Sequence, residues 1–377
     1  MKNDKLVVIS TCEEYKSTTI YKILKQQINF FNYEKFYNKK ILLKPNLLSA
    51  QKPEKSVTTH PEFLSAVIRL FKCFNCRIFV GDSPSTLNFN EVIKTTGIKD
   101  VCEKENVEIL NLTTYPKIEF EFNKFGLKKI IISKIVEDVD YIINLPKLKT
   151  HSLMFLTCGI KNMYGLVPGM TKAIYHRYAL NSEDFFEILY TVYQYKKPEL
   201  TIVDGIMGMD GEGPSGGNVK KFSVILTSDD AESVDWFILY KFFKKSTKFY
   251  DRILKLKKPN IIYHNFKSEL EFKNFVFPQT TFFISVLPKW ILNLIKPFFW
   301  FYPFILQEKC RKCGKCYDIC PKKTIKYINK NYFVFRENCI SCFCCLETCP
   351  YNAIKIQRSV VYELIFKLKD LISKLIK

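Results

Sequence analysis

The two cysteine runs near the C-terminal end constrain the fold of this chain more than any other feature. In each run, two residues separate the first three cysteines, three residues precede the fourth, and a proline follows directly. The first run is Cys310, Cys313, Cys316 and Cys320, and the second is Cys339, Cys342, Cys345 and Cys349. Three thiols two residues apart on a tight loop converge on one small centre, whereas the fourth starts the helix beyond the loop. Proline after the fourth cysteine presets the backbone turn that ends it.

This double run has the spacing of bacterial ferredoxins with two [4Fe–4S] clusters, in which the fourth cysteine of each run ligates the other cluster. We therefore assign one cluster to Cys310, Cys313, Cys316 and Cys349, and the second to Cys339, Cys342, Cys345 and Cys320. A structural zinc site needs only one or two Cys-x-x-Cys pairs, and disulfides do not demand this regularity. Cys344, between two of these ligands, is expected to be a packed bystander.

The other cysteines and the N-terminus indicate a reducing compartment. Five further thiols, at Cys12, Cys73, Cys76, Cys102 and Cys158, are scattered without a pairing pattern. Free thiols beside a cluster motif are typical of the cytosol, and residues 1–10 contain no apolar run long enough for a signal peptide. The sequence predicts a cytoplasmic protein.

The formal charge of +21 at pH 7 is the compositional feature that needs an explanation. A nucleic-acid partner is the obvious functional interpretation, and two oxidised clusters with their thiolates would offset only about four charges. However, the lysines are spread along the whole chain without a long basic block. We therefore favour a solvated lysine surface over a nucleic-acid site, and keep an RNA-binding protein stabilised by clusters as a third hypothesis.

The first 245 residues alternate apolar strands with helical stretches. A helix is predicted to open at Pro61, with Thr59 or His60 at its cap, and another to run from about Glu232 to Phe243. Strands are predicted at 5–10, 40–44, 76–81, 107–112, 129–135, 140–145, 200–203 and 223–228. Strand–helix–strand order predicts an α/β fold with a mostly parallel sheet and crossover helices. A small α+β domain like that of bacterial ferredoxins would follow it.

Four segments are predicted: an α/β domain at 1–245, an insertion with an apolar linker at 246–306, a ferredoxin-type domain at 307–358 and an amphipathic helix at 359–377. Prolines and lysines break the apolar stretch 282–306, which excludes a spanning helix of about 20 residues. That stretch is either an interdomain linker or an interfacial segment. The basic C-terminal helix docks on protein or contacts a membrane surface. No sequence pattern indicates the oligomeric state.

Polar residues follow several of the predicted strands. Ligands of parallel α/β sheets bind outside the carboxyl ends of the strands, so these residues are candidates for one site, although Asp, Asn, Ser and Gly are also ordinary turn formers. Lys147, Lys149, His151 and Lys161 are the candidates for catalysis on an anionic substrate, and Lys44, Asn46, Asp82, Ser83, Asp204 and Asp210 for ligand binding. Asp82, Asp204 and Asp210 would hold an additional divalent metal or act as bases.

The segment 204–217 contains six glycines and three carboxylates in fourteen residues. It is neither a Walker A sequence nor an ordered G-x-G-x-x-G opening a helix. We expect it to cradle an anion or to hold a metal.

The order of these motifs resembles the domain-of-unknown-function 362 family over about residues 40–240. The resemblance rests on Lys44-Pro-Asn-Leu, Thr59-His-Pro, Gly81-Asp-Ser-Pro, Leu145-Pro-Lys-Leu-Lys-Thr-His151, Gly159-Ile-Lys-Asn-Met-Tyr-Gly165 and Val203-Asp-Gly. Members often carry a C-terminal ferredoxin-type domain with two clusters, so the resemblance implies a redox-linked cytoplasmic protein without an assigned activity. The chain departs from the family's end motif at Asp230-Ala-Glu-Ser and has a long insertion after residue 245.

The sequence therefore leaves two main hypotheses. In the first, the chain is an iron–sulfur oxidoreductase or its electron-transfer subunit, which exchanges electrons with a redox partner protein and acts on a small anion at the α/β domain. In the second, it is a non-catalytic electron carrier or assembly protein whose α/β domain binds a protein partner. They differ in whether Lys147, Lys149 and His151 face a small pocket or a flat surface.

Overall fold

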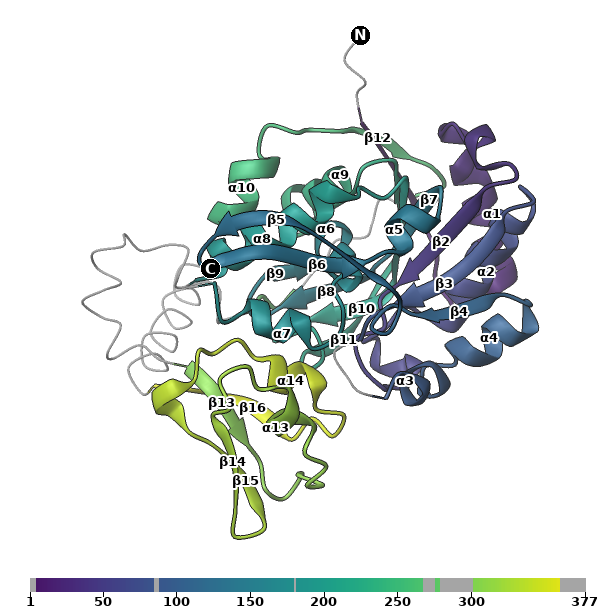
Figure 1. Cartoon of the computed structure of the whole chain (residues 1–377). Helices are drawn as coiled ribbons and strands as arrows, with labels where there is room; N and C mark the ends of the chain where they lie inside the picture. Colours follow the sequence, from purple (N-terminus) through teal and green to yellow (C-terminus); the bar gives the residue numbers. More distant parts are fainter. Residues whose placement is uncertain (1–4, 85–87, 180, 267–274, 279–300, 360–377) are drawn as a thin grey trace.

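The structure is a computed structural model that describes residues 5–84, 88–179, 181–266, 275–278 and 301–359. A large α/β unit is built around one sheet, and a small unit formed by residues 301–359 packs against one end of it (Figure 1). Helix α14 (Cys344–Thr348) lies on the side of the small unit that faces the large one, and the hairpin β14–β15 (Ile325–Ile328 and Asn331–Val334) points away.

The large unit contains a ten-stranded mixed sheet. Its main path is β12 (Asn260–Tyr263), β1 (Leu6–Thr11), β11 (Asn218–Ser228), β10 (Leu200–Asp210), β7 (Tyr141–Leu145), β2 (Lys40–Pro45), β3 (Arg77–Asp82) and β4 (Glu108–Asn111). From β10 to β4 all neighbours are parallel, so the carboxyl ends of β7, β2 and β3 lie side by side. The short strands β8 (Lys147–His151) and β9 (Phe155–Thr157) extend the sheet beside β10.

Both faces of the sheet are covered, as continuous apolar strands require. In β2, Ile41 and Leu43 pack into one core, whereas Leu42 packs into the other. The first core is closed by α1 (Ser17–Gln27), α2 (Pro61–Lys72), α3 (Phe89–Thr95) and α4 (Ile98–Lys104). The second is closed by α5 (Ile135–Asp138), α6 (Gly159–Asn162), α8 (Ser182–Tyr195), α9 (Ala231–Phe237), α10 (Lys248–Leu254) and the hairpin β5–β6 (Lys117–Lys124 and Leu127–Ser133). Helix α7 (Thr171–Tyr175) lies between this side and the small unit.

The small unit has the two-fold plan expected of its two cysteine runs. Helix α13 (Lys315–Ile319) lies within the first run and α14 within the second, so the fourth cysteine of each run follows a helix where the sequence led us to expect that it starts one. Strands β13 (Phe301–Ile305) and β16 (Ile354–Arg358) pair antiparallel and tie its ends together. A separate core forms around Ile319, Ile325 and Leu346.

The predicted fold class is confirmed: a mostly parallel α/β sheet precedes a small ferredoxin-like unit. Two boundaries differ from expectation. The sheet does not end at residue 245, because β12 pairs with β1 in parallel, and the small unit begins at Phe301 because β13 is needed to pair with β16. The apolar stretch 282–306 lies largely outside the described residues, and the predicted C-terminal helix lies almost wholly outside them. Among the described helices, none has the length and apolarity to cross a bilayer.

The α6 turn, which carries Lys161, is held by a buried carboxylate from α9. Asp235 accepts hydrogen bonds from the backbone N–H groups of Gly159 (2.7 Å) and Ile160 (3.0 Å). These N–H groups lie in the first turn of a helix, where no intrahelical partner exists. Asp235 therefore fixes the start of α6 against the sheet.

We expect Asp235→Asn to lower the free energy of unfolding by about 1–3 kcal/mol, because the amide nitrogen would face one backbone N–H and leave it unpaired. Asp229→Asn is the control. Asp229 makes one partly exposed ion pair with Lys5, at 3.4 Å, and such pairs contribute about 0–1 kcal/mol. Anaerobic denaturant unfolding of both variants checks this, and equal losses would contradict the role of Asp235.

Candidate functional site

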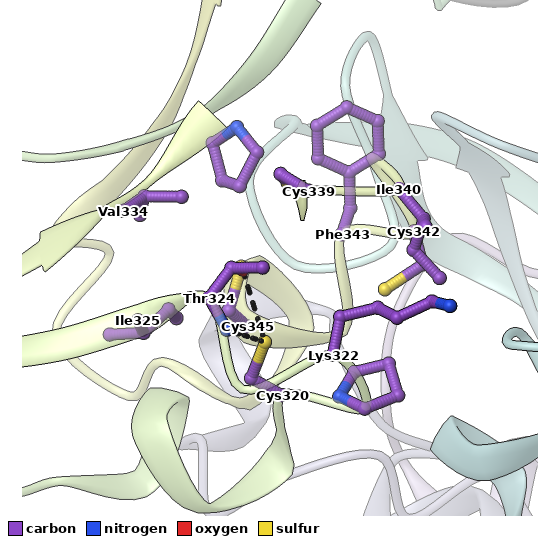
Figure 2. A pocket seen from close by; sticks show the side chains of 12 residues that line it. Cys320, Lys322, Thr324, Ile325, Val334, Cys339, Ile340, Cys342, Phe343 and Cys345 are labelled. Atoms are coloured by element: carbon purple, nitrogen blue, oxygen red, sulfur yellow. Dashed lines mark hydrogen bonds between the residues drawn. The ribbon is translucent and has the colours of Figure 1, made fainter. Parts of the chain in front are cut away.

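The small unit forms two hollows, each lined by four cysteines. Figure 2 shows the hollow around Cys320, Cys339, Cys342 and Cys345. The other contains Cys310, Cys313, Cys316 and Cys349. Counted with the solvent space at its mouth, each hollow has a volume of about 320 Å³. The two sets match the crossed assignment made from the spacing, in which the fourth cysteine of each run joins the other set.

The residues of each hollow suit an iron–sulfur cluster rather than a single ion. Four thiols and no other metal-binding side chain line each one. In the part of the chain that the structure describes, no three His, Cys, Asp or Glu side chains are close enough to hold one metal ion. A cubane presents its irons at separate corners, so its thiolates stand further apart than the ligands of one ion. The backbone N–H of Thr324 also donates to the sulfur of Cys320, at 3.3 Å.

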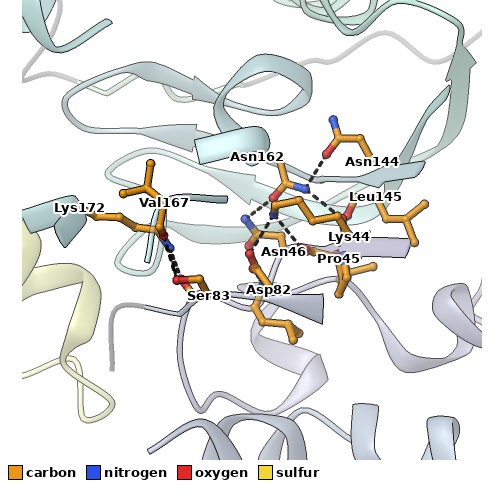
Figure 3. Close-up of polar contacts among 12 residues, drawn as sticks. Lys44, Pro45, Asn46, Asp82, Ser83, Asn144, Leu145, Asn162, Val167 and Lys172 are labelled. Carbon is orange, nitrogen blue, oxygen red and sulfur yellow. Dashed lines mark hydrogen bonds and ion pairs between the residues drawn. The ribbon is translucent and has the colours of Figure 1, made fainter. Parts of the chain in front are cut away.

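Two of the candidate lysines are buried in ion pairs at the strand ends. The Nζ of Lys44 lies 2.9 Å from Asp82, whose other oxygen accepts from the backbone N–H of Leu47 (Figure 3). The Nζ of Lys147 lies 3.0 Å from Asp204, and both side chains are fully buried. Asp204 also accepts from the hydroxyl of Tyr15, at 2.7 Å. Each of these carboxylates already neutralises one ammonium group.

A chain of amide side chains links the ends of β2 and β7 to α6. Asn46 donates to Asn162 (3.0 Å), Asn162 to Asn144 (2.8 Å), and Asn144 to the carbonyl of Gly159 (2.9 Å). The Oδ1 of Asn46 accepts from Lys149, at 3.1 Å. Because every amide here is buried and bonded, the chain holds Lys149 in a fixed position relative to α6.

Three lysines of the same region have no carboxylate of the α/β unit as a hydrogen-bonded partner. Lys149 is fully buried and donates to Asn46 and to the carbonyl of Val57. Lys172 donates to the carbonyl and, at 3.4 Å, to the hydroxyl of Ser83 (Figure 3). Lys161 makes no hydrogen bond or ion pair within the described ranges. Burial lowers the pKa of all three, to about 7 for Lys172.

Besides Asp82, which acts on Lys149 and Lys172, a carboxylate from the ferredoxin-like unit acts on all three lysines. Glu347, in α14, places Oε1 3.0 Å from the Nε2 of His151, a close polar contact without the alignment of a directed hydrogen bond. Although burial opposes ionisation of Glu347, the contact with His151 and the charges of Lys161 and His176 lower its pKa to about 2. The Nδ1 of His151 accepts from two backbone N–H groups, at 3.0 Å each. Burial lowers the pKa of His151 to about 4, so the neutral ring carries its proton on Nε2.

The glycine-rich segment forms part of the contact between the two units. Ser215 donates to the carbonyl of Leu346 at 3.4 Å, and Glu212 pairs with Arg358 at 2.8 Å. A Cβ at Gly217 or Gly213 would collide with the backbone of this hairpin or of β8. The glycines therefore permit a close approach of the chain to itself. The structure uses this segment for docking, where the sequence led us to expect an anion cradle.

The structure gathers most of the predicted site residues and separates one. Lys44, Asn46, Asp82, Ser83, Lys147, Lys149, His151, Lys161 and Asp204 lie on neighbouring elements at one end of the sheet. Asp210 lies apart, where it contacts Lys220 (3.5 Å) and accepts from the backbone N–H of Val276. The three aspartates expected to share a divalent metal thus have separate partners and do not converge.

Sequence reasoning missed three residues of this region. Glu347 was passed over although it is the one acidic residue in the second cysteine run. Lys172 lies in the segment after Gly169 that carried no recognised motif, and Tyr15 lies far upstream in the sequence. The signal for Glu347 was an acid inside a motif otherwise explained by its cysteines, and no local pattern identifies the other two.

A pair of adjacent cysteines tests the ligand assignment. We expect Cys345→Ser to lose one cluster, leaving about four irons per chain, because Cys345 lines a hollow. Cys344→Ser should retain about eight irons, because the equally buried Cys344 lines neither hollow. Iron and acid-labile sulfide analysis of anaerobically purified protein decides this. Loss of a cluster in the Cys344 variant would overturn the assignment.

Comparison with known proteins agrees with this division of the chain. Residues 41–240 match the family described as Domain of unknown function (DUF362), and residues 302–350 match a 4Fe-4S dicluster domain. Thylakoid-associated protein sll1697 of Synechocystis is 33% identical over 205 residues, which are 53% of this chain and 61% of that protein. The chain thus spans about three fifths of the length of that relative.

Among solved structures, the lactate racemase apoprotein of Thermoanaerobacterium thermosaccharolyticum is similar to this chain, with 12% identity and a TM-score of 0.37. The similarity covers 60% of this chain and 54% of the racemase chain. That score is too low for any inference about the present site. The family match covers more than half of the chain and includes the strand ends that carry the lysines. The chain belongs to the DUF362 family and carries a 4Fe-4S dicluster domain at its C-terminal end.

Proposed function

We propose that this protein is an iron–sulfur redox enzyme, or the electron-transfer subunit of one, that acts on a small anion bound by Lys149, Lys161 and Lys172. Two [4Fe–4S] clusters, when bound, supply one-electron transfer. The observation that carries the proposal is the position of Glu347. It lies between the ligands Cys345 and Cys349, and its carboxylate contacts His151 in the α/β unit. The cluster unit and the lysine site are therefore in direct contact.

The charge balance of the site supports an anionic ligand. Lys44 and Lys147 have their own aspartates, whereas Lys149, Lys161 and Lys172 share the charge of Glu347, with a contribution from Asp82 at Lys149 and Lys172. Buried ammonium groups are costly unless a counter-charge or hydrogen bonds compensate them. When all three lysines are protonated, the group has an excess of two positive charges. A ligand with two negative charges, such as a dicarboxylate or a phosphate ester, would balance it.

The remaining side chains have supporting roles. His151 is held neutral with its Nε2–H toward the site, so it can donate a hydrogen bond to an anion or to a developing negative charge. Asn46 and Asn162 orient Lys149 and α6. Ser83 fixes Lys172 through its carbonyl. Lys44 and Lys147 are held in ion pairs, so Lys147 is less suited to catalysis than we expected from the sequence.

A further divalent metal has no support from Asp82, Asp204 and Asp210, since each is engaged separately. We also propose a cytoplasmic location, from the scattered free thiols. The name of the Synechocystis relative describes association with thylakoids, so attachment to a membrane surface is the alternative location.

Removal of Lys161 tests the anion site. We expect Lys161→Gln to weaken binding of small dianions by about tenfold or more. Of the three lysines of the anion site, Lys161 is the one whose ammonium group has no hydrogen-bond or ion-pair partner among the described residues. Iron content should be unchanged. Lys129→Gln, which removes the same charge from an exposed strand of the β5–β6 hairpin, should leave binding within about twofold. Anaerobic calorimetry with malonate, sulfate and phosphate measures this. If the unaltered protein binds none of them at millimolar concentration, the result favours the hypothesis of a non-catalytic electron carrier.

The pKa of Lys172, lowered to about 7 by burial, predicts how anion affinity depends on pH. Below that pH the side chain is charged and attracts the anion, and above it the neutral amine does not. Affinity for a dianion should therefore fall as the pH rises from about 6 to 8. Sulfate is the suitable probe, because it stays fully ionised over this range. Lys172→Gln should bind sulfate more weakly at pH 6 and with little change toward pH 8. A pH dependence equal to that of the unaltered protein would contradict the role of Lys172.

A further inference from the structure

The two cysteine hollows differ in their access to solvent. Of the eight cysteines that line them, Cys313 is the one with an exposed side chain, and the others are buried or half-buried. Cys313 belongs to the first hollow, which is also lined by Arg311 and by the exposed Tyr351. An electron carrier must approach a cluster closely, so the edge at Cys313 is the accessible one.

The opposite side of the ferredoxin-like unit is closed by the α/β unit. Helix α14 places Leu346 against Ser215 and Glu347 against His151. Pro350 accepts a hydrogen bond from Gln51, at 3.0 Å. The second hollow contributes Cys345, which is buried at this side. The α/β unit thus covers α14, whereas Cys313 meets solvent beside Lys315, which reaches Glu91 of the α/β unit.

The face around Cys313 is positively charged. Arg311 and Lys312, directly before Cys313, are both exposed, and within the described ranges neither has a carboxylate partner. By contrast, Lys315 in the same hollow pairs with Glu91, at 3.1 Å. Residues 301–358 contain eleven lysines and arginines against four acidic residues. Two oxidised clusters with their ligands would offset only about four charges, so the unit as a whole stays cationic.

We propose that the surface formed by Arg311, Lys312, Cys313 and Tyr351 is the docking site of a small acidic one-electron carrier protein. Unpaired basic side chains around the exposed ligand attract an acidic partner and raise the association rate. The exposed aromatic ring of Tyr351 gives an apolar contact of the kind enriched at interfaces. Redox encounters of this kind bury less than about 1,200 Å², so a small surface around one exposed ligand suffices.

The transfer of one electron at this face balances without any further reactant. Cys310, Cys313, Cys316 and Cys349 would hold the cluster that accepts one electron from the carrier, so the carrier would be oxidised and the cluster reduced. No bond forms or breaks. This inference goes beyond the proposed function, because it holds whether or not the lysine site binds a substrate.

Charge reversal at the docking surface tests the proposal. The probe is an acidic flavodoxin, and the full-length, cluster-loaded protein is used. We expect Arg311→Glu with Lys312→Glu to weaken binding of oxidised flavodoxin by at least about tenfold in anaerobic calorimetry. The same double variant should be reduced by flavodoxin hydroquinone at least about tenfold more slowly. Binding of the unaltered protein should weaken as ionic strength rises.

The β14–β15 hairpin offers a matched control. Lys326 and Lys330 are exposed like Arg311 and Lys312, and Lys330 shares the left-handed backbone conformation of Lys312 (φ 62° and 55°). Lys326→Glu with Lys330→Glu therefore makes the same change of charge, and it also places one glutamate at a residue with left-handed backbone conformation. It should alter flavodoxin affinity by less than about threefold. Photochemical reduction by a neutral deazaflavin should proceed equally in all three proteins.

Equal losses of affinity in the two double variants would overturn the proposal, because net charge alone would then explain binding. Affinity independent of salt would also overturn it. If the Glu variant contains fewer irons than the unaltered protein, Arg311→Gln with Lys312→Gln replaces it, with Lys326→Gln and Lys330→Gln as control. Malonate binding measured on the same proteins separates this proposal from the proposed function, since it reports the lysine site alone.

Discussion

The contact of Glu347 with His151, beside the lysines of the α/β unit, is the interaction on which the rest of the arrangement depends. The ferredoxin-like unit supplies this carboxylate from the helix between two ligands, next to one buried and two half-buried lysines. Removing the partner of a buried charge typically costs about 3–5 kcal/mol. The electrostatics of the site therefore hold the two units together as strongly as the hydrogen bonds of Gln51 and Ser215 do.

The parallel half of the sheet explains why the lysines meet at all. Because β7, β2 and β3 are parallel neighbours, their carboxyl ends bring Asn144, Lys44 and Asp82 together without any long loop. The amide chain through Asn46 and Asn162 then extends this edge to α6. Rigid secondary structure thus positions the polar groups, and flexible loops contribute little to their placement.

The cluster ligands and the fold class were predictable from the sequence because each rests on a local and repetitive signal. Cysteine spacing fixes which thiols can converge, and apolar strands with polar ends fix a parallel sheet and its binding edge. The pairing of each lysine was not predictable, because it depends on contacts between distant segments. Asp82 and Asp204 were expected to share a metal, yet each lies beside a different ammonium group. Glu347 was hidden for the same reason, since its partners come from another unit.

The position of Glu347 also bears on how the protein matures. Helix α14 is five residues long, and from Cys345 to Cys349 the chain carries a ligand of each hollow with Glu347 midway between them. So short an element cannot be ordered at one of these residues and remain free at the others. Placement of the ligands Cys345 and Cys349 therefore also places Glu347. If the inorganic centres order this helix, a chain that has not received its iron would present His151 and the neighbouring lysines without the carboxylate of Glu347.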